Sequence, residues 1–122
     1  MSVQSYRDLK VWQIGMDIAE AIYELTRDFP KQEVYGLTSQ MQRAAVSVPA
    51  NLAEGHASTT TKDFLRYVGI ALGSLAELET HLLLAKRLDY GSPDRIAEMM
   101  LTLDELGRML RALQKSLRAK LK

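Results

Sequence analysis

Apolar residues recur along this chain at alternating steps of three and four, the spacing that aligns side chains on one face of an α-helix. Breaks rich in Pro, Gly and Ser at residues 29–31, 55–58 and 90–93 divide the pattern into four segments. The pattern predicts helices over residues 5–28, 33–54 and 60–89, and from 93 into the C-terminal tail. Ser5, Thr60 and Ser92 have the spacing of helix caps, and Gly55 is expected to end the second helix.

The short connections between these segments make neighbouring helices antiparallel. The sequence therefore predicts an all-α fold, an antiparallel up-and-down four-helix bundle, with residues 1–122 forming a single domain. The third and fourth helices are longer than the first two by about two turns. The end of the fourth helix is thus expected to lack cover within its own bundle.

The predicted first helix carries two apolar stripes, whereas one would be enough for a monomer. Together with a small-residue face on the second helix and the end of the fourth, the extra stripe predicts a homo-oligomer. The expected subunit contacts are Leu9, Trp12, Met16, Tyr23, Val46, Pro49, Ala50, Ala53, Leu117 and Leu121.

Composition is that of a compact soluble domain, with 47% hydrophobic and 25% charged residues in 122. The chain has no Cys, which excludes disulfides, thiolate zinc sites and cysteine nucleophiles. Its N-terminus has no secretory apolar region, and the longest purely aliphatic run, Leu82–Ala85, is far too short to span a bilayer. We therefore expect a cytosolic protein that does not enter membranes.

Charge is unevenly distributed, although the net charge is only +1. Residues 1–107 carry 10 basic and 15 acidic residues, whereas 108–122 carry six basic residues and no acid. The topology brings the starts of the first and third helices near this tail. The predicted basic pole consists of Arg7, Lys10, Lys62, Arg66, Arg108, Arg111, Lys115, Arg118, Lys120 and Lys122. It is either a solvated face or a site for RNA or DNA phosphates, and no stacking aromatic pair is evident beside it.

Polar residues form a second pattern along the flank of the second and third helices. The facing lines are Gln40, Arg43, Ser47, Asn51 and Glu54 on one helix and Ser74, Glu77 and His81 on the other. They form either a pocket that binds a ligand or works as an acid and a base, or a structural polar layer in which Arg43 pairs with Glu77 or Glu54. We favour the polar layer because no cleft is evident, and we assign no catalytic residue.

Metal and cofactor motifs are missing from the sequence. A di-iron bundle needs two Glu-x-x-His motifs, but Glu77 and His81 are four apart and His56 lies in a predicted loop. Gly69 and Gly73 fall inside the third helix, where close helix packing explains them better than a phosphate-binding loop. We therefore expect no metal, no cofactor and no enzyme activity.

Long segments of the chain resemble the four-helix bundle family known as S23 ribosomal proteins, which includes proteins encoded by intervening sequences in bacterial 23S ribosomal RNA genes. The segments are Tyr6–Trp12, Phe29–Lys31, Glu33–Gln40, Arg43–Gly55 and Ala71–Thr80. The family is also similar to the accessory protein of diversity-generating retroelements, which binds nucleic acid and a reverse transcriptase. The resemblance implies a cytosolic bacterial homopentamer without enzyme activity.

Two departures from the family pattern remove positive charge, namely Gln42 and the segment 56–58. The combined prediction is a non-catalytic, oligomeric, RNA-associated binding or scaffold protein. The alternative is a structural module that binds a protein and makes no nucleic-acid contact.

Overall fold

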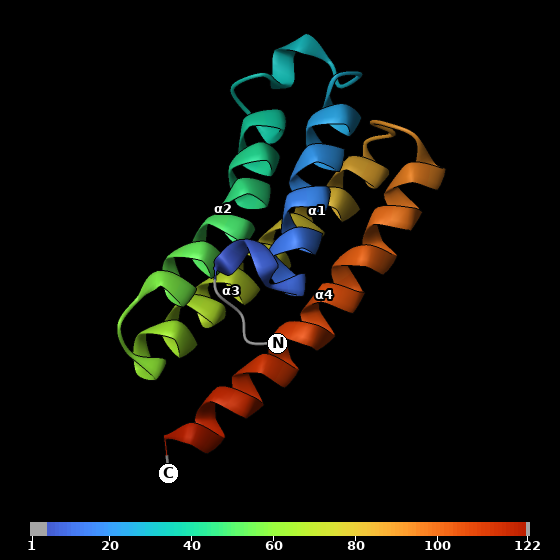
Figure 1. Ribbon diagram of the computed structural model, residues 1–122. Helices are drawn as coiled ribbons and strands as arrows, with labels where there is room; N and C mark the ends of the chain where they lie inside the picture. Colours follow the sequence, from blue (N-terminus) through green and yellow to red (C-terminus); the bar gives the residue numbers. More distant parts are fainter. Residues whose placement is uncertain (1–4, 122) are drawn as a thin grey trace.

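The structure, a computed structural model that describes residues 5–121, is an antiparallel four-helix bundle (Figure 1), and the predicted fold class is confirmed. Its helices are α1 (Lys10–Thr26), α2 (Leu37–Ala57), α3 (Thr61–Arg87) and α4 (Pro93–Lys120). Two short 3-10 turns, η1 (Tyr6–Asp8) and η2 (Lys31–Glu33), precede α1 and α2.

All four helices contribute to one apolar core. Ile22 of α1, Met41 of α2, Leu78 of α3 and Leu106 of α4 are fully shielded from solvent. Burying an aliphatic side chain of this size stabilises a fold by about 1.5–3 kcal/mol, so these positions hold the bundle together. All four residues belong to the apolar stripes that the spacing of three and four residues predicts.

The two longer helices begin where their caps predict. The Thr60 hydroxyl accepts a hydrogen bond of 3.0 Å from the Asp63 amide, and the Ser92 hydroxyl accepts one of 3.4 Å from the Arg95 amide. Ser5 instead caps η1, and α1 starts only at Lys10 because Leu9 is extended. These local hydrogen bonds fix the register of α3 and α4 at their first turns.

Gly55 does not end α2, so this prediction is wrong. The helix continues to Ala57, and Gly55 is buried within it. A Cβ added at Gly55 would lie 2.7 Å from Cβ of Tyr67 and 3.0 Å from Cδ1 of Phe64. The glycine therefore serves close packing of α2 against the start of α3.

Gly69 and Gly73 were expected to allow close helix packing, and within one chain they do not. Both are exposed; a Cβ at Gly73 would meet nothing within 4 Å, and one at Gly69 would meet only the Gln114 amide nitrogen, at 3.9 Å. Each interior glycine costs a helix about 1 kcal/mol relative to alanine. No packing contact in the described chain offsets this cost at Gly73.

Length and hydropathy alone would allow α3 to cross a membrane, contrary to the expectation from its short aliphatic runs. Its most apolar 18-residue window has a mean hydropathy of 1.4, and 39% of that window is buried in the bundle. Core helices of soluble bundles meet the same criterion. The unburied part includes Ile70, Leu83 and Leu84, each 39–47% exposed.

Candidate functional site

A polar hollow of about 330 Å³ lies between α2 and α3. Five of the eight residues predicted for the polar layer line it, together with Ala44: Gln40, Arg43, Ser47, Ser74 and Glu77. The two lines meet because α2 and α3 run antiparallel with their polar flanks on the same side. The spacing in the sequence therefore located this cluster.

A hydrogen-bonded link between the two helices includes Ser47 and Ser74, which line the hollow. The Asn51 amide donates to the carbonyl of Ser47 at 2.7 Å and to its hydroxyl at 2.9 Å. The hydroxyl oxygens of Ser47 and Ser74 are 2.8 Å apart. The Ser47 hydroxyl accepts from Asn51, and either hydroxyl can be the donor in the bond between Ser47 and Ser74. Asn51 thus orients a hydrogen bond that crosses from α2 to α3.

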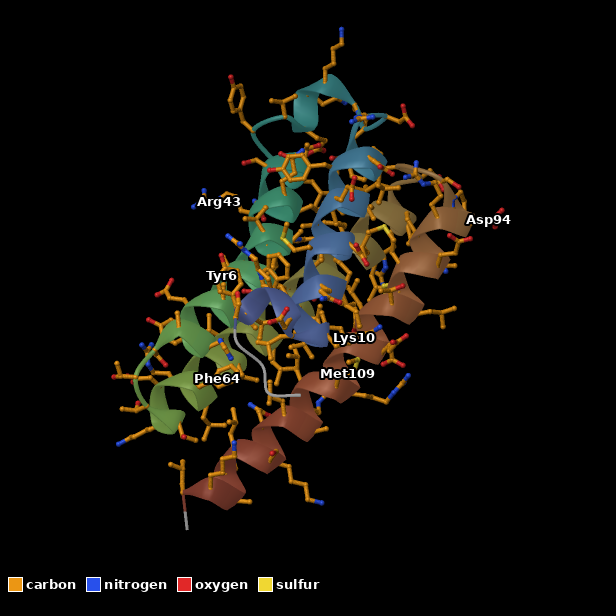
Figure 2. All side chains as sticks on the ribbon, in the orientation of Figure 1. Tyr6, Lys10, Arg43, Phe64, Asp94 and Met109 are labelled. Atoms are coloured by element: carbon orange, nitrogen blue, oxygen red, sulfur yellow. The ribbon has the colours of Figure 1, made fainter. Side chains whose placement is uncertain are left out.

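Arg43 does not make the predicted ion pair with Glu77 or Glu54. Within residues 5–121, Arg95 pairs with Glu24 and Arg108 pairs with Asp104, and the His81 imidazole lies beside Glu77, a contact that is ionic only when the imidazole is protonated. Arg43 is exposed and points away from the bundle (Figure 2), and the Glu77 side chain is 59% exposed. Water screens the charges of Arg43 and Glu77 from each other. The two side chains therefore do not form a buried ion pair in the hollow.

His81 is the most buried member of the polar layer, at 7% exposure. Its Nε2 lies 3.8 Å from a carboxylate oxygen of Glu77, one helical turn earlier. Its Nδ1 is buried and has no hydrogen-bond partner among the described residues. His81 thus lies at the margin of the hollow rather than in its lining.

The predicted basic residues lie on one half of the bundle but do not form a single compact pole. The contact between the Gly69 position and Gln114 places the start of α3 beside the last turns of α4. Lys10 of α1 instead lies at the level of Met109, several turns before the end of α4 (Figure 2). We define the basic end as Lys62, Arg66, Arg111, Lys115, Arg118 and Lys120, which are all exposed. Lys122 lies outside the described residues.

Few of these cations are neutralised. Arg108, next to the basic end, pairs with Asp104 at 2.7 Å. In the part of the chain that the structure describes, no residue of the basic end makes a salt bridge. The basic end thus keeps its positive charge available for an anionic partner.

Aromatic side chains lie beside the basic end, a feature that the sequence reasoning missed. The Arg66 guanidinium lies over the Tyr67 ring, 4.4 Å from its centroid. The His56 and Phe64 rings meet edge to face with centroids 5.7 Å apart. Phe64 and Tyr67 are three apart at the start of a predicted helix, and this spacing was the signal that both rings share a face.

The predicted subunit contacts divide by exposure. Pro49 and Leu117 are buried within one chain, so they are wrong as surface candidates: Pro49 packs against Gly15, and Leu117 is only 4% exposed. Leu9, Trp12 and Ala53 are partly buried, with Trp12 edge-on to Tyr6. The exposed remainder is Met16, Tyr23, Val46, Ala50 and Leu121.

Four of these exposed residues form a strip along the seam between α1 and α2. Tyr23 and Val46 line one hollow of about 380 Å³. Met16 lies seven residues before Tyr23, and Ala50 lies four residues after Val46, so each shares a helix face with a residue of that hollow. We name Met16, Tyr23, Val46 and Ala50 the α1–α2 strip.

Within residues 5–121, no group of three His, Cys, Asp or Glu side chains is placed to bind a metal ion.

The pKa of one tyrosine, Tyr90, is raised by its hydrogen bond to Glu33. Tyr90 lies at the opposite end of the bundle from the basic end.

Comparison with known proteins settles the family. The model of the 23S rRNA-intervening sequence protein family matches residues 7–112. The chain belongs to this family. The predicted resemblance is thereby confirmed, although the match stops before Lys115, Arg118 and Lys120.

A solved structure shows the same fold. It is a protein of unknown function from the S23 ribosomal protein family of Bacteroides thetaiotaomicron, with a TM-score of 0.77 and 23% identity. The similarity covers 86% of this chain and 98% of that one. No curated protein matches the sequence.

Proposed function

We propose that this member of the 23S rRNA-intervening sequence protein family is a non-catalytic, homo-oligomeric scaffold that associates with RNA. The observation that carries the proposal is the acid-free end of α4, where Arg111, Lys115, Arg118 and Lys120 are exposed and make no salt bridge within residues 5–121. Cations of this kind bind nucleic acid by releasing the counterions condensed on its phosphates.

Self-association strengthens this contact. The α1–α2 strip leaves Met16, Tyr23 and Val46 each 43–46% exposed, and apolar side chains that lie together on a surface favour contact with a second copy. Covering the strip with a second copy removes it from water and brings several basic ends into one particle. The positive electrostatic potential around the oligomer is then stronger than that around a single chain, whose net charge is only +1. The resemblance to S23 proteins implies a ring of five in the bacterial cytosol.

RNA is the proposed polyanion because the family is named for intervening sequences of 23S rRNA. Catalysis is left out of the proposal because Arg43 and Glu77 are open to solvent, and no hydrogen bond or ion pair joins them in residues 5–121. A general acid or base needs a partner and a shielded position to hold its proton-transfer geometry. Neither side chain of the hollow has both: Arg43 makes no salt bridge within residues 5–121, and Glu77, although 3.8 Å from His81, is 59% exposed.

Size-exclusion chromatography with light scattering tests the proposal, with nucleic-acid absorbance recorded across the peak at about 50 mM and about 200 mM salt. We expect one oligomer that carries RNA at low salt and releases it at high salt. Replacing Arg111, Lys115, Arg118 and Lys120 by Gln abolishes the RNA but keeps the oligomer. The matched control replaces four exposed basic residues elsewhere, Arg27, Lys31, Lys86 and Arg87, and leaves the RNA in place.

A second candidate is a protein-binding module without nucleic-acid contact. The exposed apolar residues Ile70, Leu83 and Leu84 of α3 favour it, because they lie outside the α1–α2 strip. An oligomer free of RNA at both salt concentrations, and unchanged by the tail substitutions, would replace the RNA proposal with this one.

A further inference from the structure

We propose that the start of α3 is a stacking site for unpaired bases of single-stranded nucleic acid, built from Arg66, Tyr67 and Phe64. This inference rests on the proposed function and names the form of nucleic acid that the basic end recognises. It goes beyond charge because aromatic rings and guanidinium planes bind the faces of bases, which only an open strand presents.

The stack begins with Tyr67 and Arg66. The guanidinium carbon of Arg66 lies 4.4 Å from the centroid of the Tyr67 ring, within cation–π range. Arg66 is exposed, so the guanidinium keeps an open side above the ring. A planar guanidinium held on a ring is well suited to take a base on that open side, because it offers a flat surface and a positive charge together.

The rings are held in place from below by α2. A Cβ added at Gly55 would clash with Cβ of Tyr67 and contact Cδ1 of Phe64, so both aromatic residues pack directly on the α2 backbone. His56 supports Phe64 edge to face, with an interplanar angle of 88°. Phe64 and Tyr67 are partly exposed, and Figure 2 shows Phe64 near the connection between α2 and α3. Such preorganisation reduces the entropy lost on binding.

Charge around the rings gives the strand a path for its phosphates. Lys62 lies one turn before Arg66 on the exposed side of α3. Because α3 and α4 are antiparallel and Gly69 lies beside Gln114, Arg118 falls near the level of Arg66. Two acids lie near the rings in sequence, Asp63 on α3 and Glu54 on α2. The phosphates are therefore expected on the α4 side of Arg66, away from Glu54 on α2.

Comparing the affinity for single-stranded and double-stranded nucleic acid distinguishes base stacking from charge attraction alone. Bases in a duplex are already stacked, so the site should prefer a single strand. Contact through phosphates alone would favour the duplex, whose charge density is higher. Removing one stacking partner from a base typically lowers affinity about tenfold.

Fluorescence anisotropy provides the test, with the full-length protein and three probes: a labelled single-stranded RNA, its duplex, and single-stranded DNA of the same sequence. Inorganic polyphosphate serves as a base-free competitor. We expect the single strands to bind more tightly than the duplex. Tyr67→Leu and Arg66→Lys should each weaken single-strand binding about tenfold and leave duplex binding and the inhibition constant of polyphosphate unchanged. Tyr35→Leu is the control, since Tyr35 is 97% exposed at the other end of the bundle.

The outcomes are distinguishable. Equal affinity for single strand and duplex, with both variants unchanged, overturns the stacking site, while the proposed function stands if the tail variant still loses binding. Failure of the wild type to bind any probe overturns both. Arg66→Lys changes an exposed side chain and keeps its charge, so it tests the site even if Tyr67→Leu unfolds. Comparison of the RNA and DNA strands shows which sugar the site accepts.

Discussion

The Tyr90 phenol donates a hydrogen bond of 3.0 Å to the Glu33 carboxylate and ties the α3–α4 connection to the turn before α2. The second oxygen of the same carboxylate accepts from the Leu37 amide at 3.1 Å and so caps the start of α2. Glu33 therefore holds two connections together at the end of the bundle opposite the basic end. The hydrogen bond to Glu33, burial and the Glu33 charge raise the pKa of Tyr90 above its ordinary value of 10.0.

This pKa shift predicts a loss of stability at high pH. The neutral phenol is the form that the fold favours, so its contribution is complete below pH about 10 and is lost as pH rises through the raised pKa. Phenolate absorbance should show Tyr90 ionising above its ordinary value of 10.0, with Tyr90→Phe used to assign the titration. Glu33→Gln should lower the pKa of Tyr90 towards its ordinary value. Titration of Tyr90 at its ordinary value, unchanged by Glu33→Gln, would contradict the account.

Two glycines should respond to alanine in opposite directions. Gly55→Ala should lower the free energy of unfolding by about 1–3 kcal/mol, because its Cβ would lie 2.7 Å from Cβ of Tyr67. Gly73→Ala should raise it by about 0.5–1 kcal/mol, because its Cβ meets nothing within 4 Å and alanine favours the helix. Urea denaturation measures both. If Gly73→Ala instead lowers the free energy of unfolding, this would indicate that the face of α3 around Gly73 packs against another chain.

The polar layer predicts unequal roles for Ser47 and Arg43. Ser47→Ala breaks the bond to Ser74 and removes an acceptor from Asn51, so we expect a loss of about 1 kcal/mol in the free energy of unfolding. Arg43→Gln should change it by less than about 0.5 kcal/mol, because Arg43 is exposed and makes no salt bridge in residues 5–121. Thermal denaturation of both variants decides the matter, and a larger effect at Arg43 would reverse the assignment.

The α1–α2 strip predicts where copies of the chain meet. Met16→Glu combined with Val46→Glu should convert the oligomer to monomers, because it places charges on residues that are 45% and 43% exposed in one chain. Leu101→Glu is the control, since Leu101 is 73% exposed on α4. Light scattering reports the mass of each variant. An oligomer that survives the double substitution would exclude the strip as the interface.

Local signals in the sequence were enough to place the two long helices. Thr60 and Ser92 act on amides three residues away, so their capping roles are evident from sequence spacing. The apolar periodicity likewise identified core positions such as Leu78 and Leu106. Both signals depend only on helix geometry, which is the same in every bundle.

Long-range packing could not be predicted in the same way. Gly55 has the local features of a helix terminator, but its role depends on Tyr67, whose approach is set by the tertiary fold. Leu117 was expected to lie bare, yet it is buried because α3 and α4 differ in length by only one residue, 27 against 28. Arg43 was expected to find a carboxylate, but exposed side chains gain little from ion pairs.

The most direct test of RNA association is the salt dependence of binding to a single-stranded RNA, measured for the wild type, the four-residue tail variant and the matched control. Each phosphate contact on a single strand contributes about 0.7 to the slope of log affinity against log salt. We predict that neutralising Arg111, Lys115, Arg118 and Lys120 reduces the slope by up to about 3, while the control with Arg27, Lys31, Lys86 and Arg87 neutralised keeps the wild-type slope. Identical slopes for all three proteins would contradict the account.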